Sequence, residues 1–182
     1  MIDLNPASRA VIDLLEAVDP ARFGDPTPCT EYTVADLLEH LDEVARGSAA
    51  LARKVAGPAT PGSPIALSDN SWRVTLSSRL RELAAAWSDP AAWQGTTDVG
   101  VELPNTVWGA TALTELVVHG WDLAQALDRP FILPESTLNA CLDHVIDFVP
   151  NAPLPDLWGA TVTVSDRAPL LDRIVAITGR TP

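Results

Sequence analysis

The chain has 182 residues, enough for one domain with a sizeable core, and 47% of them are hydrophobic against 20% charged. Its formal net charge of −12 repels nucleic-acid phosphates and anionic lipid headgroups, so neither nucleic acid nor a membrane surface is expected as a partner. No apolar run is long enough for a transmembrane helix, and the first residues lack the pattern of a signal peptide. The two cysteines make no disulfide framework, and the cytoplasm is therefore the expected location.

The first half of the chain is predicted to contain three amphipathic helices, because apolar residues recur in it with the 3.6-residue helical period. The second of these helices is expected to begin with a capping box formed by Thr33 and Asp36, and its apolar face to extend to Val55. Each of the three helices is expected to end shortly before a proline. They span residues 5–18, 33–56 and 71–87, and the prolines are Pro20, Pro58 and Pro90.

The second half is predicted to begin with a short extended segment, because Thr97, Val99 and Val101 alternate with other residues. Asn105 or Thr106 is expected to cap the next helix. That helix should end at Pro130, and a fifth helix should start at Pro134 with Leu138, Leu142, Val145, Ile146 and Val149 facing inward. The tail contains the extended segment ATVTVS and a last short helix in APLLDRIVAIT.

These elements predict an all-α fold, an antiparallel four-helix bundle, because long amphipathic helices are joined by short or proline-rich connections. Residues 1–182 are expected to form a single domain, in which about residues 151–182 are a short C-terminal appendage.

Three ionisable residues lie on one side of an otherwise apolar helix, in the stretch TELVVHGWDLAQALD. Glu115, His119 and Asp122 fall within a sector roughly 60° wide. Burying an unpaired carboxylate costs roughly several kcal/mol, so a compensating positive charge is expected nearby. No Lys or Arg precedes Arg129 on this helix. A divalent metal is one candidate for the compensating charge. A histidine that is simply hydrogen-bonded to a buried carboxylate is the alternative.

His40 is the candidate third ligand, since a catalytic zinc site usually has three protein ligands and one open position. It lies on the flank of the apolar face of the second helix, in LLEHLDE, and should face a neighbouring helix. The alternative for His40 is an ordinary histidine at a helix interface. His144 stands beside Asp143 and close to Asp147, a pattern typical of a helix surface, and is not expected to bind metal.

Three segments together resemble the DinB-like metal-binding superfamily, in the branch typified by the mycothiol-dependent maleylpyruvate isomerase metal-binding domain. They are PTPCTEYTVADLLEHL, TELVVHGWDLAQALDRP and the closing LLDRIVAITGRTP. Tyr32 stands where that branch usually has tryptophan. The resemblance implies a DinB-like bundle that holds a divalent metal, commonly zinc, through His40, Glu115 and His119.

The resemblance also implies a cofactor, namely a low-molecular-weight thiol such as mycothiol. The expected activity is S-transfer, thiol addition or isomerisation on a small-molecule substrate. The alternative is a non-catalytic metal-binding bundle that serves as a binding or sensing module. Maleylpyruvate isomerase continues into a separate C-terminal domain that supplies an arginine, whereas this chain stops at Pro182, which counts against the isomerisation itself. The sequence is compatible with a homodimer and does not decide the oligomeric state.

Other residues have both a functional and a structural interpretation. Asp122 either orients His119 or a bound water, or makes a helix-surface or capping interaction. Cys29 precedes a helix N-terminus, where the dipole lowers the pKa of a thiol, and is either a nucleophile or a small packing residue. A row of arginines on the third helix could contact an anionic substrate, but is expected to be a solvated face, and two further residues are expected in the core. The arginines are Arg73, Arg79 and Arg81, and the core residues are Trp121 and Cys141.

Overall fold

The computed structural model describes residues 1–55, 61–152 and 158–182, and within them helices joined by loops are accompanied by a single small hairpin. Three single-turn 3₁₀ helices, η1 (Pro20–Arg22), η2 (Pro90–Trp93) and η3 (Val149–Asn151), join longer elements. The longer elements are α1 (Asn5–Leu15), α2 (Val34–Ala52), α3 (Trp72–Trp87), β1 (Thr96–Asp98), β2 (Glu102–Pro104), α4 (Asn105–Ala126), α5 (Glu135–Phe148) and α6 (Leu170–Ile177). The predicted all-α fold is thereby confirmed.

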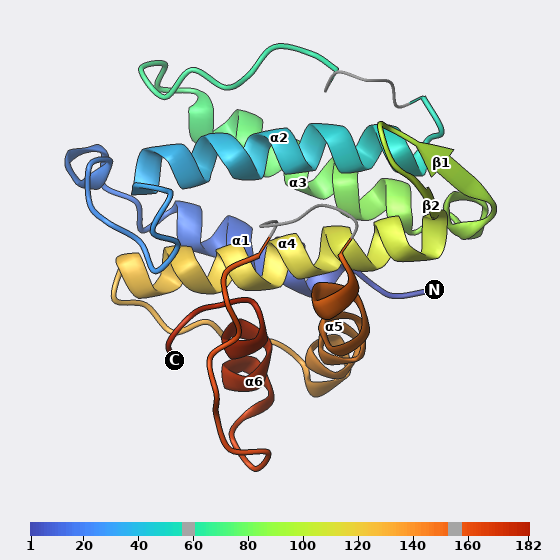
Figure 1. Cartoon of the computed structure of the whole chain (residues 1–182). Coiled ribbons are helices and arrows are strands. Elements are labelled where there is room, and N and C mark those ends of the chain that lie inside the picture. The colour runs from blue at the N-terminus through green and yellow to red at the C-terminus, as the bar shows by residue number, and fades with distance from the viewer. Residues whose placement is uncertain (56–60, 153–157) are drawn as a thin grey trace.

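Helices α1 to α4 form a bundle in which α1 and α2 each pack against both α3 and α4 (Figure 1). Figure 1 shows that α2 and α3 run in the same direction, opposite to α1 and α4. Two parallel neighbours need a connection that returns along the bundle, and residues 61–71 run back beside α2 to reach the start of α3 (Figure 1). The antiparallel pair of α2 and α4 sets side chains from distant parts of the sequence opposite one another.

Helix α4 is the central element, since α1 and α2 cover it on one side and α5 and α6 on the other. This position explains why its sequence is apolar nearly all round. Two glycines allow close packing: a Cβ at Gly109 would lie 2.6 Å from Trp93, and one at Gly120 would lie 2.5 Å from Phe131. Trp121 is 6% exposed, in agreement with the predicted core position.

The helix starts follow the sequence more closely than the helix ends do. The capping box of Thr33 and Asp36 is present at the start of α2. The predicted end of this helix at residues 57 and 58 lies outside the described residues, but α2 already ends at Ala52, and Lys54 has a positive φ of 57°. Val55 is therefore not on the packed face, and its exposed fraction is 69%. The helices α1 and α4 likewise end several residues before the next proline, because proline limits a helix without fixing its last residue.

The prediction that Asn105 or Thr106 caps α4 is wrong, because these are its first two residues and neither side chain makes a capping hydrogen bond. Asn105 has another role. Its amide side chain donates to the Gln94 carbonyl and accepts from the Thr97 hydroxyl, and so ties the helix start to the hairpin. The single extended segment predicted around residues 97–101 is instead a hairpin, in which residues 99–101 form the turn between β1 and β2 and Thr97 pairs with Leu103.

The extended segment expected at residues 160–165 pairs with no strand among the described residues, and its Val162 N–H donates to the Ala176 carbonyl. The inward position predicted for Ile146 is wrong. Ile146 points outward, with 47% of its surface exposed, because α5 is covered only on the sides that face α4 and α6. Cys141 is fully buried on the same helix, as predicted.

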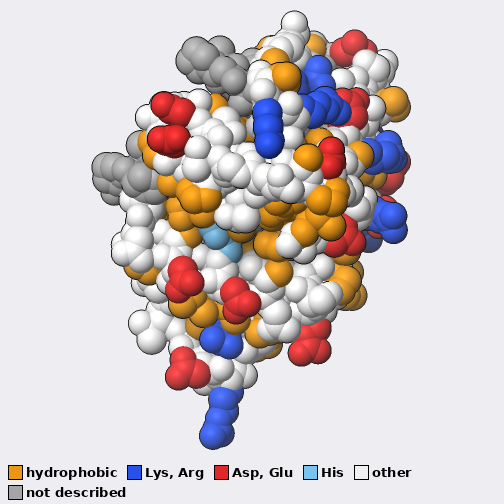
Figure 2. All heavy atoms as spheres, turned by 90° about the vertical axis from the view of Figure 1, so that its right-hand side faces the viewer, with side chains coloured by type: hydrophobic (Ala, Val, Ile, Leu, Met, Phe, Trp, Pro, Cys, Tyr) orange, Lys and Arg blue, Asp and Glu red, His pale blue; other side chains and the backbone are white. Residues whose placement is uncertain are grey.

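On the face shown in Figure 2, acidic side chains are scattered among hydrophobic and uncharged ones, in keeping with the net charge of −12. Among the described residues, no helix has both the length and the apolar character needed to cross a membrane.

Candidate metal centre

The structure brings His40, Glu115 and His119 together, with one ligand atom from each within 4.8 Å of the others. The Glu115 Oε2 atom lies 3.2 Å from His40 Nε2 and 3.2 Å from His119 Nε2. Glu115 and His119 are one turn apart on α4, and His40 faces them from α2. Side chains 75 residues apart in the sequence meet here because α2 and α4 pack side by side.

His119 stands between two carboxylates. Its Nδ1 atom lies 3.0 Å from Asp122 Oδ2, while its Nε2 faces Glu115. A neutral imidazole has one N–H, so it can donate to only one of them. Burial lowers the pKa of His119, but the hydrogen bonds to Asp122 and Glu115 outweigh it and raise the pKa overall. Burial likewise raises the pKa of Glu115, and the hydrogen bonds from His119 and His40 bring it well below its usual range. The position between the two Nε2 atoms and the carboxylate thus favours a positive charge.

Asp122 is completely buried and is paired with Arg180, from the turn that follows α6. The Arg180 Nε donates to Oδ1 at 3.2 Å and its Nη2 donates to Oδ2 at 2.9 Å. Complete burial excludes the helix-surface interpretation of Asp122. The sequence of α4 contains no cation close enough to compensate Asp122, and the structure supplies one from 58 residues away.

A pocket of about 630 Å³ opens onto the three candidate ligands. Its walls come from three segments: the loop before α2 with Cys29 and Tyr32, residues 158–160, and the turn at residues 178–180. The Tyr32 hydroxyl lies 3.4 Å from His40 Nδ1, and burial raises the pKa of this tyrosine. Such a cavity has the size of a small-molecule site.

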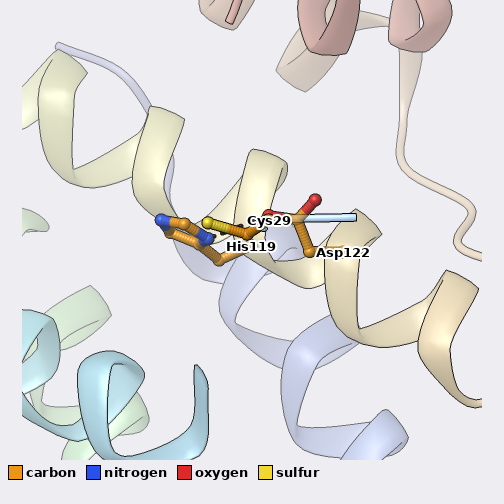
Figure 3. A group of neighbouring side chains, drawn as sticks. All are labelled: Cys29, His119 and Asp122. Atoms are coloured by element: carbon orange, nitrogen blue, oxygen red, sulfur yellow. Dashed lines mark hydrogen bonds and ion pairs between the residues drawn. The ribbon is translucent and has the colours of Figure 1, made fainter. Parts of the chain in front are cut away.

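Cys29 lies at the pocket wall beside His119 and Asp122 (Figure 3). Its Sγ and one ligand atom each of His119 and Asp122 lie within 4.8 Å of one another. His40 and Glu115 do not belong to this cluster. Burial raises the pKa of the thiol despite the nearby Arg180, which is the opposite of the shift that the nucleophile interpretation requires. A protonated thiol is a weak nucleophile and a poor metal ligand, which favours the packing interpretation.

The arginines of α3 lie outside this pocket. They were predicted to form a solvated face, and for two of them, Arg73 and Arg79, this prediction is wrong. Arg73 lies over the Trp72 ring at 4.4 Å and donates to the Leu15 carbonyl at 3.1 Å. Arg79 forms an ion pair with the buried Asp42. Arg81 is exposed, in agreement with the expectation.

His144 is half-buried and stays away from the candidate ligands. Its ring stacks on Phe148 at 4.8 Å and its Nε2 lies 3.3 Å from the Thr111 hydroxyl. Burial lowers its pKa to about 4. Its position between α5 and α4 differs from the helix surface that the neighbouring aspartates suggested.

Two residues at the pocket were missed in the sequence: Arg180 and Trp158. The closing GRTP, which contains Arg180, is one of the segments that resemble the family. Nothing in the sequence relates this arginine to the carboxylate of Asp122 on α4. The indole Nε1 of Trp158 is buried and has no hydrogen-bond partner among the described residues.

The fold and this cluster define a helical bundle with a candidate metal centre between two helices. The family model described as the mycothiol maleylpyruvate isomerase N-terminal domain matches residues 4–124, and the chain belongs to this family. The matched range contains His40, Glu115, His119 and Asp122, and it ends before α5, α6 and Arg180.

Two uncharacterized proteins from two strains of Mycobacterium tuberculosis are each 31% identical to the chain over 125 residues. These alignments cover 66% of this chain and 63% of each relative, so somewhat less than two thirds of the relatives' length is matched. A solved structure, that of a histidine-to-alanine mutant of the mycothiol-dependent maleylpyruvate isomerase, has a TM-score of 0.55 and 17% identity. That match covers 78% of this chain and 66% of the other, and at this identity it shows the fold alone.

Proposed function

We propose that His40, Glu115 and His119 bind a divalent metal ion, most readily zinc, and that the ion serves the chemistry of a small thiol in the adjoining pocket. The convergence of two imidazoles and one carboxylate within 4.8 Å supports this proposal most strongly. Nitrogen and carboxylate oxygen atoms are ligands that zinc accepts. The family also supports it, since the related isomerase is described as mycothiol-dependent.

The charges around the pocket fit a bound cation. Glu115 and Asp122 are two buried or nearly buried carboxylates, and Arg180 is the one guanidinium that pairs with them among the described residues. With neutral imidazoles this cluster has an excess of one negative charge. Burial lowers the pKa of His119, but the hydrogen bonds to Asp122 and Glu115 raise it overall, so the cluster favours an added positive charge. A divalent ion would supply that charge.

Three protein ligands would leave one coordination position of a tetrahedral ion free for water or a thiolate, as in catalytic zinc sites. A bound metal ion would stabilise the thiolate form of a small thiol at neutral pH. The protein itself would supply the enclosing walls, and the hydroxyl of Tyr32 lies beside His40 at the edge of the site. S-transfer, thiol addition or isomerisation are the reactions that such a site would support, with mycothiol as the thiol that the family suggests.

We further propose that residues 1–182 act as one domain. Helix α6 packs on α5 and α4, and the following turn contributes to the pocket wall. A cytoplasmic location also remains a proposal.

Metal analysis of the purified protein and of three alanine variants tests the metal centre. We expect about one zinc ion per chain in the wild type and a sharp loss in His40→Ala, Glu115→Ala and His119→Ala, because each change removes one of three ligands. His144→Ala is the matched control and should keep its metal. Unchanged stoichiometry and affinity in His40→Ala would show that the three-ligand site is wrong.

Cobalt substitution then tests the thiol. We expect a small thiol to add a sulfur-to-metal charge-transfer band to the cobalt protein, since a thiolate would occupy the open position. The band should be absent from the Glu115→Ala protein. A cobalt spectrum indifferent to mycothiol and to other small thiols would favour the non-catalytic metal-binding module.

A further inference from the structure

We infer that Arg180 is a positioning residue of the proposed metal centre: it holds Asp122, and Asp122 holds the imidazole of His119. This inference rests on the proposed metal site and adds a residue to it that lies outside the matched family range. Metal-binding histidines commonly donate their second ring N–H to a carboxylate that is itself held in place.

The contacts form an unbroken chain from the C-terminal turn to the candidate ligand. Arg180 approaches Asp122 with two hydrogen bonds, at 3.2 and 2.9 Å, which fix the plane of the carboxylate. Asp122 Oδ2 then lies 3.0 Å from His119 Nδ1. An N–H at Nδ1 leaves the lone pair of Nε2 directed at the side where Glu115 and His40 lie. Arg180 is 7% exposed and Asp122 0%, so water cannot replace either partner easily.

The backbone at the end of α6 is built to present Arg180. Gly179 has a φ of 91°, and the N–H groups of Gly179 and Arg180 donate to the carbonyls of Ala176 and Val175. This is the Schellman pattern that closes a helix with a left-handed glycine. The Arg180 Nη1 also donates to the Thr178 carbonyl at 2.7 Å, so the guanidinium is held from its own turn as well.

The turn is held against the pocket wall by a second segment. A Cβ at Gly179 would lie 2.6 Å from the Gly159 Cα, so the two glycines allow the chain to cross itself there. Residues 158–160 and 178–180 both line the pocket, and the Trp158 ring lies 6.0 Å from the Arg180 guanidinium. The position of Arg180 is therefore determined by tertiary packing and not by the reach of a flexible side chain.

The decisive measurement is zinc affinity, determined by competition with a chromophoric chelator. Arg180→Met should lower the affinity about 10- to 100-fold, the range for partners that orient a metal ligand. Arg180→Lys keeps the charge but loses the two-pronged hydrogen bond, and should fall between Met and the wild type. Arg46→Met is the matched control: Arg46 also pairs with a fully buried aspartate, Asp42, at 2.9 Å, so it should cost stability without changing zinc affinity.

A double-mutant cycle separates positioning from general damage. If Arg180 acts through Asp122, Arg180→Met in the Asp122→Asn background should change zinc affinity by less than about threefold, because the contact that it serves is already lost. Wild-type affinity in Arg180→Met, or full additivity of the two changes, would overturn the inference.

A second readout needs no metal. In the metal-free protein, the His119 Nδ1–H that is hydrogen-bonded to Asp122 should give a sharp, downfield proton resonance. Arg46→Met should keep this resonance, and Arg180→Met should broaden or shift it. A wild type that takes up no zinc would defeat the metal-centre proposal alone, and an unchanged resonance in Arg180→Met would defeat the role of Arg180.

Discussion

Two carboxylates of this bundle, Asp42 and Asp122, are both 0% exposed and both paired with arginine, yet their surroundings differ. Asp42 on α2 accepts from Arg46, Arg79 and the backbone N–H of Ile65. These three donors do not line the pocket that holds the candidate ligands. The two guanidinium groups carry more positive charge than the single carboxylate carries negative charge. It joins α2, α3 and the returning connection between them.

Asp122 pairs with one arginine, Arg180. Its Oδ2 atom also lies within hydrogen-bond distance of His119, which faces the pocket. Glu115 adds a second carboxylate on the same side, so negative charge exceeds positive charge there. Burial and pairing are thus shared by the two regions, and neither distinguishes a structural ion pair from a functional one. The distinguishing features are the sign of the uncompensated charge and the presence of an adjoining cavity.

The largest expected effect separates the two regions by stability. Asp42→Asn leaves the two guanidinium groups of Arg46 and Arg79 facing a neutral amide, and should lower the free energy of unfolding by about 3–5 kcal/mol. Urea denaturation measures this change, with Asp69→Asn in an exposed turn as the control. Zinc content of the folded protein should stay at the wild-type level. An Asp42→Asn protein that lost zinc but little stability would contradict the difference proposed between the surroundings of Asp42 and Asp122.

A smaller effect is expected from the turn that presents Arg180. In Gly179→Ala the new Cβ meets the Gly159 Cα, and alanine is strained at a φ of 91°. The turn must therefore shift, and zinc affinity should fall by about tenfold, as for partners that orient a ligand.

Gly100→Ala is the control for strain alone. Gly100 has a φ of 107°, and a Cβ added there would meet nothing within 4 Å, so alanine should destabilise the hairpin without changing zinc affinity. Equal zinc affinities in Gly179→Ala and Gly100→Ala would contradict the role of the turn.

The smallest expected effect concerns His144, a half-buried histidine in which burial outweighs the attraction of Asp147. Burial lowers the pKa of His144 to about 4 from an unfolded value of 6.5. Between these pH values the unfolded chain binds the proton first, so the contribution of His144 to stability is present above pH 6.5 and lost as the pH falls towards 4. Because the ring is only half-buried, this loss should be about 1 kcal/mol.

His144→Gln should remove this part of the acid destabilisation. The measurement is urea denaturation of the metal-free wild type and variant between about pH 4 and pH 7, where the unfolded histidine titrates. Parallel pH profiles of the two proteins would show that burial alone does not depress the pKa of this group.

Much of the fold could be predicted from the sequence because it rests on local patterns. The apolar period of 3.6 residues located the helices, and Thr33 with Asp36 marked the start of α2. The lower accuracy at helix ends has a physical cause: Lys54 and Asp128 take a positive φ before any proline is reached. The parallel course of α2 and α3 depends on how the bundle packs, which no local pattern records.

The candidate site divides in the same way. Glu115 and His119 could be paired from their spacing on one helix, and His40 from its position on the flank of another together with the family resemblance. Arg180 could not be predicted, because its meeting with Asp122 depends on how α6 packs and on a glycine crossing between two loops. Arg79 was assigned to a solvated face because the burial of Asp42 opposite it is a tertiary feature.

The distance in sequence between His40 and Glu115 has a thermodynamic consequence. These side chains are separated by 75 residues, so the unfolded chain holds no preassembled site and would bind the ion only weakly. With an ion in the proposed metal centre, mass action would tie the stability of the native state to the free metal concentration. Each tenfold rise in free ion above its dissociation constant would then add about 1.4 kcal/mol to the free energy of unfolding. Melting temperatures measured in buffers with and without chelator would therefore describe different equilibria of the same chain.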